Sequence, residues 1–130
     1  MTSHRDSGSA TLEIAILAPM LLFAVFAVVQ VSLWSFARSL AHAAAEEGAS
    51  AGAAHGATTA AAVARAHHFL LETGGDSLTS VVIGSGGSTA MLVRVEVHGR
   101  ALSVLPGLPG LIVEEFAQAP VERFTTDAAP

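Results

Sequence analysis

The pattern of apolar and polar positions divides the chain into one long apolar segment and a mixed C-terminal part. From Ile14 to about Phe36 the residues are almost all apolar, and Gln30, Ser32 and Ser35 are the polar exceptions. At about 1.5 Å per residue this run would form a helix of roughly 35 Å, enough to cross a hydrocarbon core about 30 Å thick. Because it is apolar on every side, we expect a membrane-spanning helix over residues 9–37.

Three side chains refine this expectation. Trp34 belongs to a residue type enriched at the membrane–water boundary, and Arg38 can extend its charged group just beyond that boundary. We therefore interpret both as interfacial anchors. Pro19 lies inside the run and lacks a backbone N–H, which predicts a kink, although a neutral membrane proline is the alternative.

Helix-forming residues continue to about Ala54, which predicts that the helix leaves the membrane unbroken and begins a helical region over 38–73. Small residues recur there every fourth position, at Gly48, Gly52 and Gly56. Residues four apart share a helix face, so this strip would let another helix approach closely. A drift in composition with a frayed helix is the other interpretation.

A second helix is expected from Ala60 to Leu71. Thr58-Thr59 is suited to cap its N-terminus, and Gly74-Gly75 would end it. The two helices would then be separated near 55–59, although one long bent helix also fits the pattern.

After Gly75 the pattern changes to that of strands. Leu78–Ile83 is rich in β-formers, and Met91–His98 alternates apolar and polar residues, so both should pair as an antiparallel hairpin through Gly84–Ser88. A last strand is expected at Glu115–Ala119 or 121–124, giving three or four strands in a module over 76–124. The tail 125–130 is expected to be disordered. The fold class is therefore α+β, with a long N-terminal helix followed by a small antiparallel sheet.

Composition excludes several classes of function. The 130 residues include no cysteine, so disulfides and thiol chemistry are impossible. The net charge is −5, with no lysine and six scattered arginines, which is unlike a nucleic-acid-binding surface. His67 and His68 are adjacent and would point about 100° apart on a helix, so they are poorly placed to share a metal. We expect no metal, no cofactor and no enzymatic activity.

A short motif stands directly before the apolar run. A polar leader, residues 1–8, ends in Gly8, and an acid, Glu13, follows five residues later at the start of the helix. An acid near a membrane helix should have a partner or a role, because burying it costs about 2.5–3.5 kcal/mol at the bilayer centre. An ordinary interfacial acid at the positive end of the helix dipole is the simpler interpretation.

The motif resembles the class III signal of type IV pilin-like proteins. Its finer pattern is similar to that of the TadE/TadG family of minor pseudopilins from tight-adherence (Tad) pilus systems, and it reads Gly8…Leu12-Glu13-Ile14-Ala15…Leu17-Ala18-Pro19. One position differs, because the family usually has an aromatic residue where this chain has Ile14.

The resemblance implies a processing site and a set of partners. A prepilin peptidase would cut between Gly8 and Ser9. Glu13 would act in this processing and in assembly with other pilin or pseudopilin subunits and the Tad machinery. The chain would lie in the cytoplasmic membrane as a single-pass protein, with its C-terminal module outside the cytoplasm. An uncleaved membrane anchor that displays a small binding module is the alternative function.

Overall fold

A computed structural model of the chain describes residues 6–123, with side chains from Ala10 onward. The expected tail, 125–130, and most of the expected leader, 1–8, lie outside these residues. The described part is an α+β protein with a long N-terminal helix, a second helix and a three-stranded antiparallel sheet. This confirms the predicted fold class.

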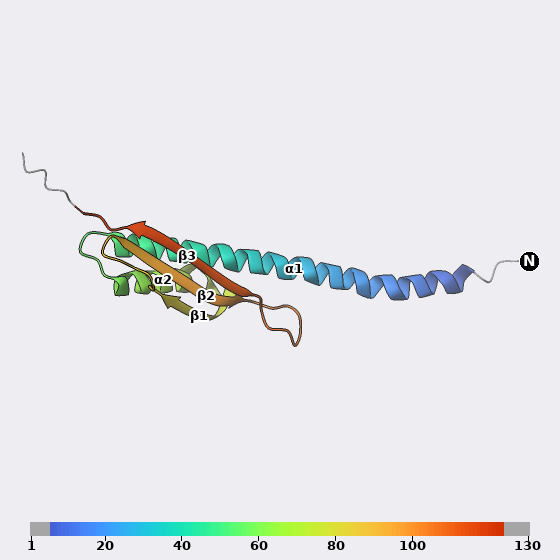
Figure 1. The fold of residues 1–130 in the computed structure, drawn as a ribbon. Coiled ribbons are helices and arrows are strands. Elements are labelled where there is room, and N and C mark those ends of the chain that lie inside the picture. Colours follow the sequence, from blue (N-terminus) through green and yellow to red (C-terminus); the bar gives the residue numbers. More distant parts are fainter. Residues whose placement is uncertain (1–5, 124–130) are drawn as a thin grey trace, which may run out of the picture.

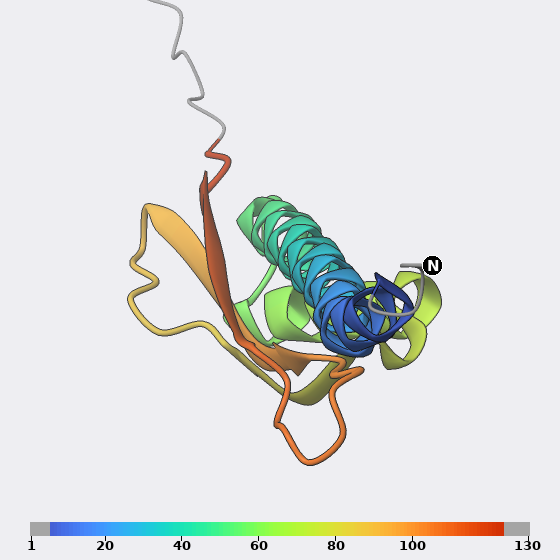
Figure 2. The same ribbon diagram turned by 90° about the vertical axis from the view of Figure 1, so that its right-hand side faces the viewer.

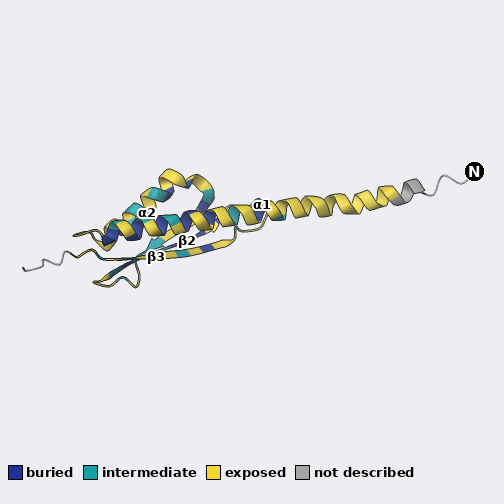
Figure 3. Cartoon of the chain, turned by 90° about the horizontal axis from the view of Figure 1, so that it is seen from above, coloured by how far each residue is buried: buried dark blue, intermediate teal, exposed yellow. Residues whose placement is uncertain are grey.

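Helix α1, Asp6–Ala53, contains 48 residues and combines the expected membrane segment with the helix beyond it (Figure 1). Its two halves differ sharply in burial (Figure 3). Residues 10–29 are almost entirely exposed, and large apolar side chains such as Phe23 are 68% exposed. From Gln30 to Ala53 the helix buries every third or fourth residue against the rest of the chain, so only this docked half belongs to the folded module.

Helix α2, Thr59–Thr73, begins one residue before and ends two residues after the expected Ala60–Leu71. The Thr58 hydroxyl caps it by accepting a hydrogen bond from the Ala61 N–H at 3.2 Å. At the other end the Gly74 N–H donates to the Leu70 carbonyl at 2.8 Å. The two helices are therefore separate, and the short turn between them lets α2 fold back along α1.

A 3-10 turn, Gly75–Ser77, leads into the strands β1 (Leu78–Gly84), β2 (Leu92–Ala101) and β3 (Ile112–Pro120). All neighbours are antiparallel in the order β1-β2-β3, which confirms the hairpin. The connection 85–91 is longer than the expected five residues. The last strand takes the first of the two predicted positions and also includes the apolar residues at 112–113.

The core lies between α1 and one face of the sheet. Inward-facing β2 and β3 side chains, among them Val95, Val97 and Val113, are almost completely buried against alanines of the docked half. Viewed along α1, the sheet lies on one side of the helix and α2 packs beside it (Figure 2). Because alanine adds little bulk, helix and sheet approach closely and a small module still excludes water from its centre.

Candidate assembly motif and docked helix

The motif lies at the exposed end of α1. Gly8 and Ser9 are in the first turns of the helix, and Glu13 follows about one turn after Ser9. The Glu13 side chain is exposed, and no other described residue forms a hydrogen bond or ion pair with its carboxylate. Any partner for this charge therefore comes from outside the described part of the chain.

Pro19 lies within α1, in the exposed half, and the helix continues on both sides of it. Proline has no N–H to donate, so the carbonyl four residues earlier, at Ala15, loses its usual helical partner. The kink remains a prediction.

Gln30 marks the point where α1 joins the module. It is 8% exposed, and its amide binds the backbone of the segment after β2 at two points. The Nε2 group donates to the Leu102 carbonyl, and Oε1 accepts from the Val104 N–H, both at 3.0 Å. In the sequence Gln30 stands out only as a polar interruption of the apolar run, although an amide in such a run is itself a sign of a specific partner.

Trp34 and Arg38 continue this contact one and two turns later. The Trp34 Nε1–H donates to the Ile112 carbonyl at 3.0 Å, and Arg38 forms an ion pair with Glu115. The Arg38 guanidinium also lies 5.8 Å from the centre of the Trp34 ring. The structure thus gives both proposed anchors a partner in β3, and their role at a membrane boundary remains a prediction.

His42 completes a stripe of polar contacts spaced by four residues. Its Nδ1 lies 3.5 Å from Glu115 and its Nε2 lies 3.4 Å from Glu46. We call Gln30, Trp34, Arg38 and His42 the polar stripe. Since residues four apart share one helix face, the stripe aligns α1 along β3 and the segment before it.

The N-terminal part of the chain is similar to a known protein family. Residues 8–50 match the TadE-like protein family. The TadE-like segment contains the Gly8–Glu13 motif, the exposed half of α1 and most of the docked half, which confirms the resemblance seen in the sequence. The family is a structural, Tad pilus-associated one. No curated protein and no solved structure matches the chain.

The TadE-like segment ends between two glycines that contact α2. A Cβ atom added to Gly48 would lie 2.7 Å from the Ala62 carbonyl oxygen, and one added to Gly52 would lie 2.5 Å from the Ala62 Cβ. Both positions therefore require the smallest side chain because α2 approaches so closely. Gly56 does not share this face, since it lies beyond the end of α1, in the turn, with φ of +76°.

Replacing Gly52 by alanine should destabilise the module. Overpacking costs about 1–3 kcal/mol, which exceeds the gain of about 1 kcal/mol that alanine brings to a helix. The 2.5 Å approach of the added Cβ to the Ala62 Cβ favours the upper part of that cost, so we expect a net loss of up to about 2 kcal/mol, measured by denaturant unfolding of the full chain in detergent micelles. Gly84→Ala is the matched control, because nothing lies within 4 Å of its added Cβ. Equal stability of the two variants would contradict the close helix contact.

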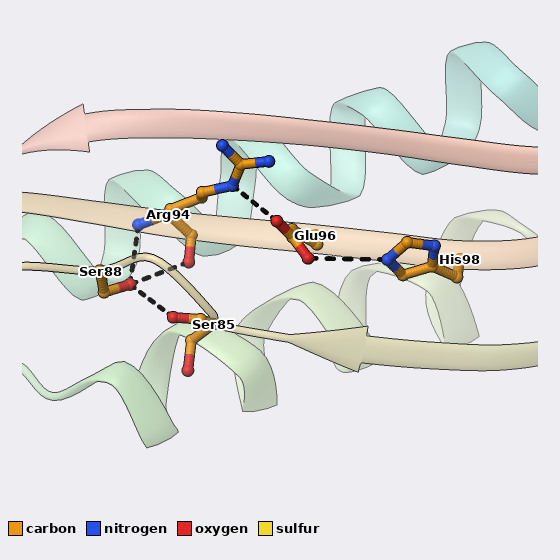
Figure 4. A network of polar contacts seen from close by, with 5 residues as sticks. All are labelled: Ser85, Ser88, Arg94, Glu96 and His98. Carbon is orange, nitrogen blue, oxygen red and sulfur yellow. Dashed lines mark hydrogen bonds and ion pairs between the residues drawn. The ribbon is translucent and has the colours of Figure 1, made fainter.

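Polar residues around the β1–β2 turn bind one another. Around the β1–β2 turn, the Ser88 hydroxyl accepts from the Arg94 N–H at 2.9 Å and lies 2.8 Å from the Ser85 carbonyl (Figure 4). Glu96 binds Arg94 at 2.7 Å and approaches His98 at 3.7 Å (Figure 4). These groups are thus engaged within the hairpin. Among the described residues, no three His, Asp or Glu side chains are arranged to hold a metal ion.

Proposed function

We propose that this chain is a minor pseudopilin, an assembly component of a Tad-type pilus or a related secretion system. The observation that carries the proposal is the Gly8–Glu13 spacing at the N-terminal end of the exposed half of α1, residues 10–29. We call this segment the bare half, because the folded module does not cover it. The TadE-like match over residues 8–50 supports the same function. The chain would sit in the cytoplasmic membrane, with its module outside the cytoplasm.

The bare half of α1 supports a membrane location. The helix is long and apolar enough to cross a bilayer, and only 6% of its most apolar 18-residue window is buried. Exposed apolar surface on this scale is stabilised by lipid or by neighbouring helices. Both environments fit a subunit that is first held in a membrane and then passed to an assembly.

Cleavage after Gly8 would create a positively charged partner for the Glu13 carboxylate. The new N-terminus at Ser9 would carry a positive amine, and Glu13 lies one turn further along the helix. Between neighbouring subunits, the Ser9 amine of one chain would pair with Glu13 of the next. A pair of this kind fixes register, because either charge left alone in an apolar setting is strongly unfavourable. The implied partners are a prepilin peptidase, other pilin subunits and the Tad assembly machinery.

The test is the intact mass and N-terminal sequence of the chain isolated from its native membrane. We expect a mature chain that begins at Ser9. A Gly8→Arg variant should remain uncut, whereas Gly86→Arg, the same substitution in an open turn of the module, should be cut normally. A native chain that retains residues 1–8 would overturn the proposal and favour the alternative, an uncleaved single-pass anchor that displays a binding module.

A further inference from the structure

The connection between β2 and β3 exposes an unusual number of apolar side chains. Between Arg100 and Glu114 the sequence carries no charge. Its exposed apolar residues form what we call the apolar tip: Leu102, Pro106, Leu108, Pro109 and Leu111. Leu108 is 59% exposed and Leu111 is 47% exposed. Such a group of leucines at the end of a loop is unfavourable in water.

The apolar tip is held where α1 leaves the module. Gln30 binds the start of the loop through Leu102 and Val104, and Trp34 binds its end through Ile112. The loop projects from the end of the module that faces the bare half of α1 (Figure 1). It therefore lies beside the helix at the level where the membrane-spanning segment begins.

The length of the bare helix brings this end of the module close to the lipid. If Glu13 stays at one boundary, the free apolar helix runs from Ile14 to Val29. These 16 residues span about 24 Å, whereas the hydrocarbon core is about 30 Å thick. The free helix is thus roughly 6 Å shorter than the core, so the end of the module is drawn against the membrane boundary.

Three further exposed apolar side chains lie near this end of the module, and we call them the apolar collar. Val31 and Phe36 on α1 are 58% and 53% exposed, and Ile112 at the start of β3 is 59% exposed. Arg100 stands at the edge of this collar, with Nη1 donating to the Gly110 carbonyl at 3.2 Å. Apolar residues bordered by an arginine are typical of surfaces that enter the headgroup layer of a membrane.

We propose that the apolar tip inserts into the interfacial layer of the same bilayer that α1 spans, so that the chain contacts the membrane at two points. The inference rests on the membrane span of the proposed function. Because the module is packed on α1, the second contact fixes the rotation of the whole chain about the helix axis, which a single span leaves free.

The chain contains no cysteine, so single spin labels can be placed without removing native residues. The full chain would be reconstituted in vesicles of phosphatidylcholine and phosphatidylglycerol, with labels at Leu108→Cys, Leu22→Cys or Met91→Cys. Leu22 reports on the span. Met91 is the matched control, since it is 69% exposed and lies at the opposite end of the module, beside Val121.

We expect the Leu108 label to collide with oxygen, which concentrates in lipid, several-fold more than with a water-soluble nickel complex. This ratio should approach that of Leu22 and exceed that of Met91. If Leu22 lies in lipid while Leu108 matches Met91, the tip is in water and the inference is wrong although the span holds. Protection of Leu108 from both reagents would indicate a protein partner and would also overturn the inference. A water-exposed Leu22 would overturn the span and the inference together.

Discussion

Replacing Glu13 by glutamine should remove the mature chain from assembled pili. The substitution keeps the size and shape of the side chain but removes its charge. In the proposed assembly, the Ser9 amine of the neighbouring subunit would then be buried without a counter-charge. The measurement is the fraction of mature chain recovered with sheared pili rather than with membranes.

The expected effect is large because breaking a buried ion pair costs about 3–5 kcal/mol, a factor of roughly 10² to 10³ or more in the assembly equilibrium. Glu46→Gln is the matched control, since it makes the same change on the docked half of α1, where the Glu46 side chain is 64% exposed. Normal recovery of the Glu13 variant in pili would show that this charge pair is not used.

Replacing Gln30 by leucine should detach the β2–β3 connection from α1. Leucine is similar in size but leaves the Leu102 carbonyl and the Val104 N–H without their partner. Each unsatisfied buried group costs about 1–3 kcal/mol, so two would cost about 2–6 kcal/mol. Both hydrogen bonds are only partly buried, so we expect the lower part of that range, a loss of about 2–4 kcal/mol in the free energy of unfolding. Denaturant unfolding of the full chain in detergent micelles measures this loss.

Hydrogen exchange distinguishes local detachment from general instability. The Val104 amide should lose its protection in the Gln30→Leu variant, while amides in the centre of β2, such as that of Val95, should lose much less. Ser32→Ala is the control, because that hydroxyl donates only to the Val28 carbonyl within α1. Unchanged protection at Val104 would show that Gln30 does not hold the connection.

Much of the fold could be predicted because its determinants are local. The apolar run predicts α1, the Thr58 hydroxyl and Gly74 bound α2, and the alternation around Val95 predicts β2. Each of these elements depends on interactions between residues that are close in the sequence, so a local pattern is enough to predict the element. The motif at Gly8 and Glu13 was recognisable for the same reason, since its elements are five residues apart.

The contacts of the polar stripe could not be predicted, because their partners lie far away in the chain. Gln30 and Leu102 are 72 residues apart, and Trp34 and Ile112 are 78 apart. Composition therefore favoured a membrane segment that extended to residue 37, whereas the structure docks the helix from Gln30 onward. Gly56 fits the small-residue strip by spacing alone, but the helix ends three residues before it.

Because α1 is one continuous helix, its bare half and the module packed on its docked half move together. The docked half, Gln30–Ala53, contains 24 residues and extends about 36 Å from the point where α1 joins the module. A change of about 10° in the tilt of the bare half would therefore swing the far end of the module by roughly 6 Å. If α1 spans a bilayer as proposed, whatever changes its tilt there also moves the outer surface of the module.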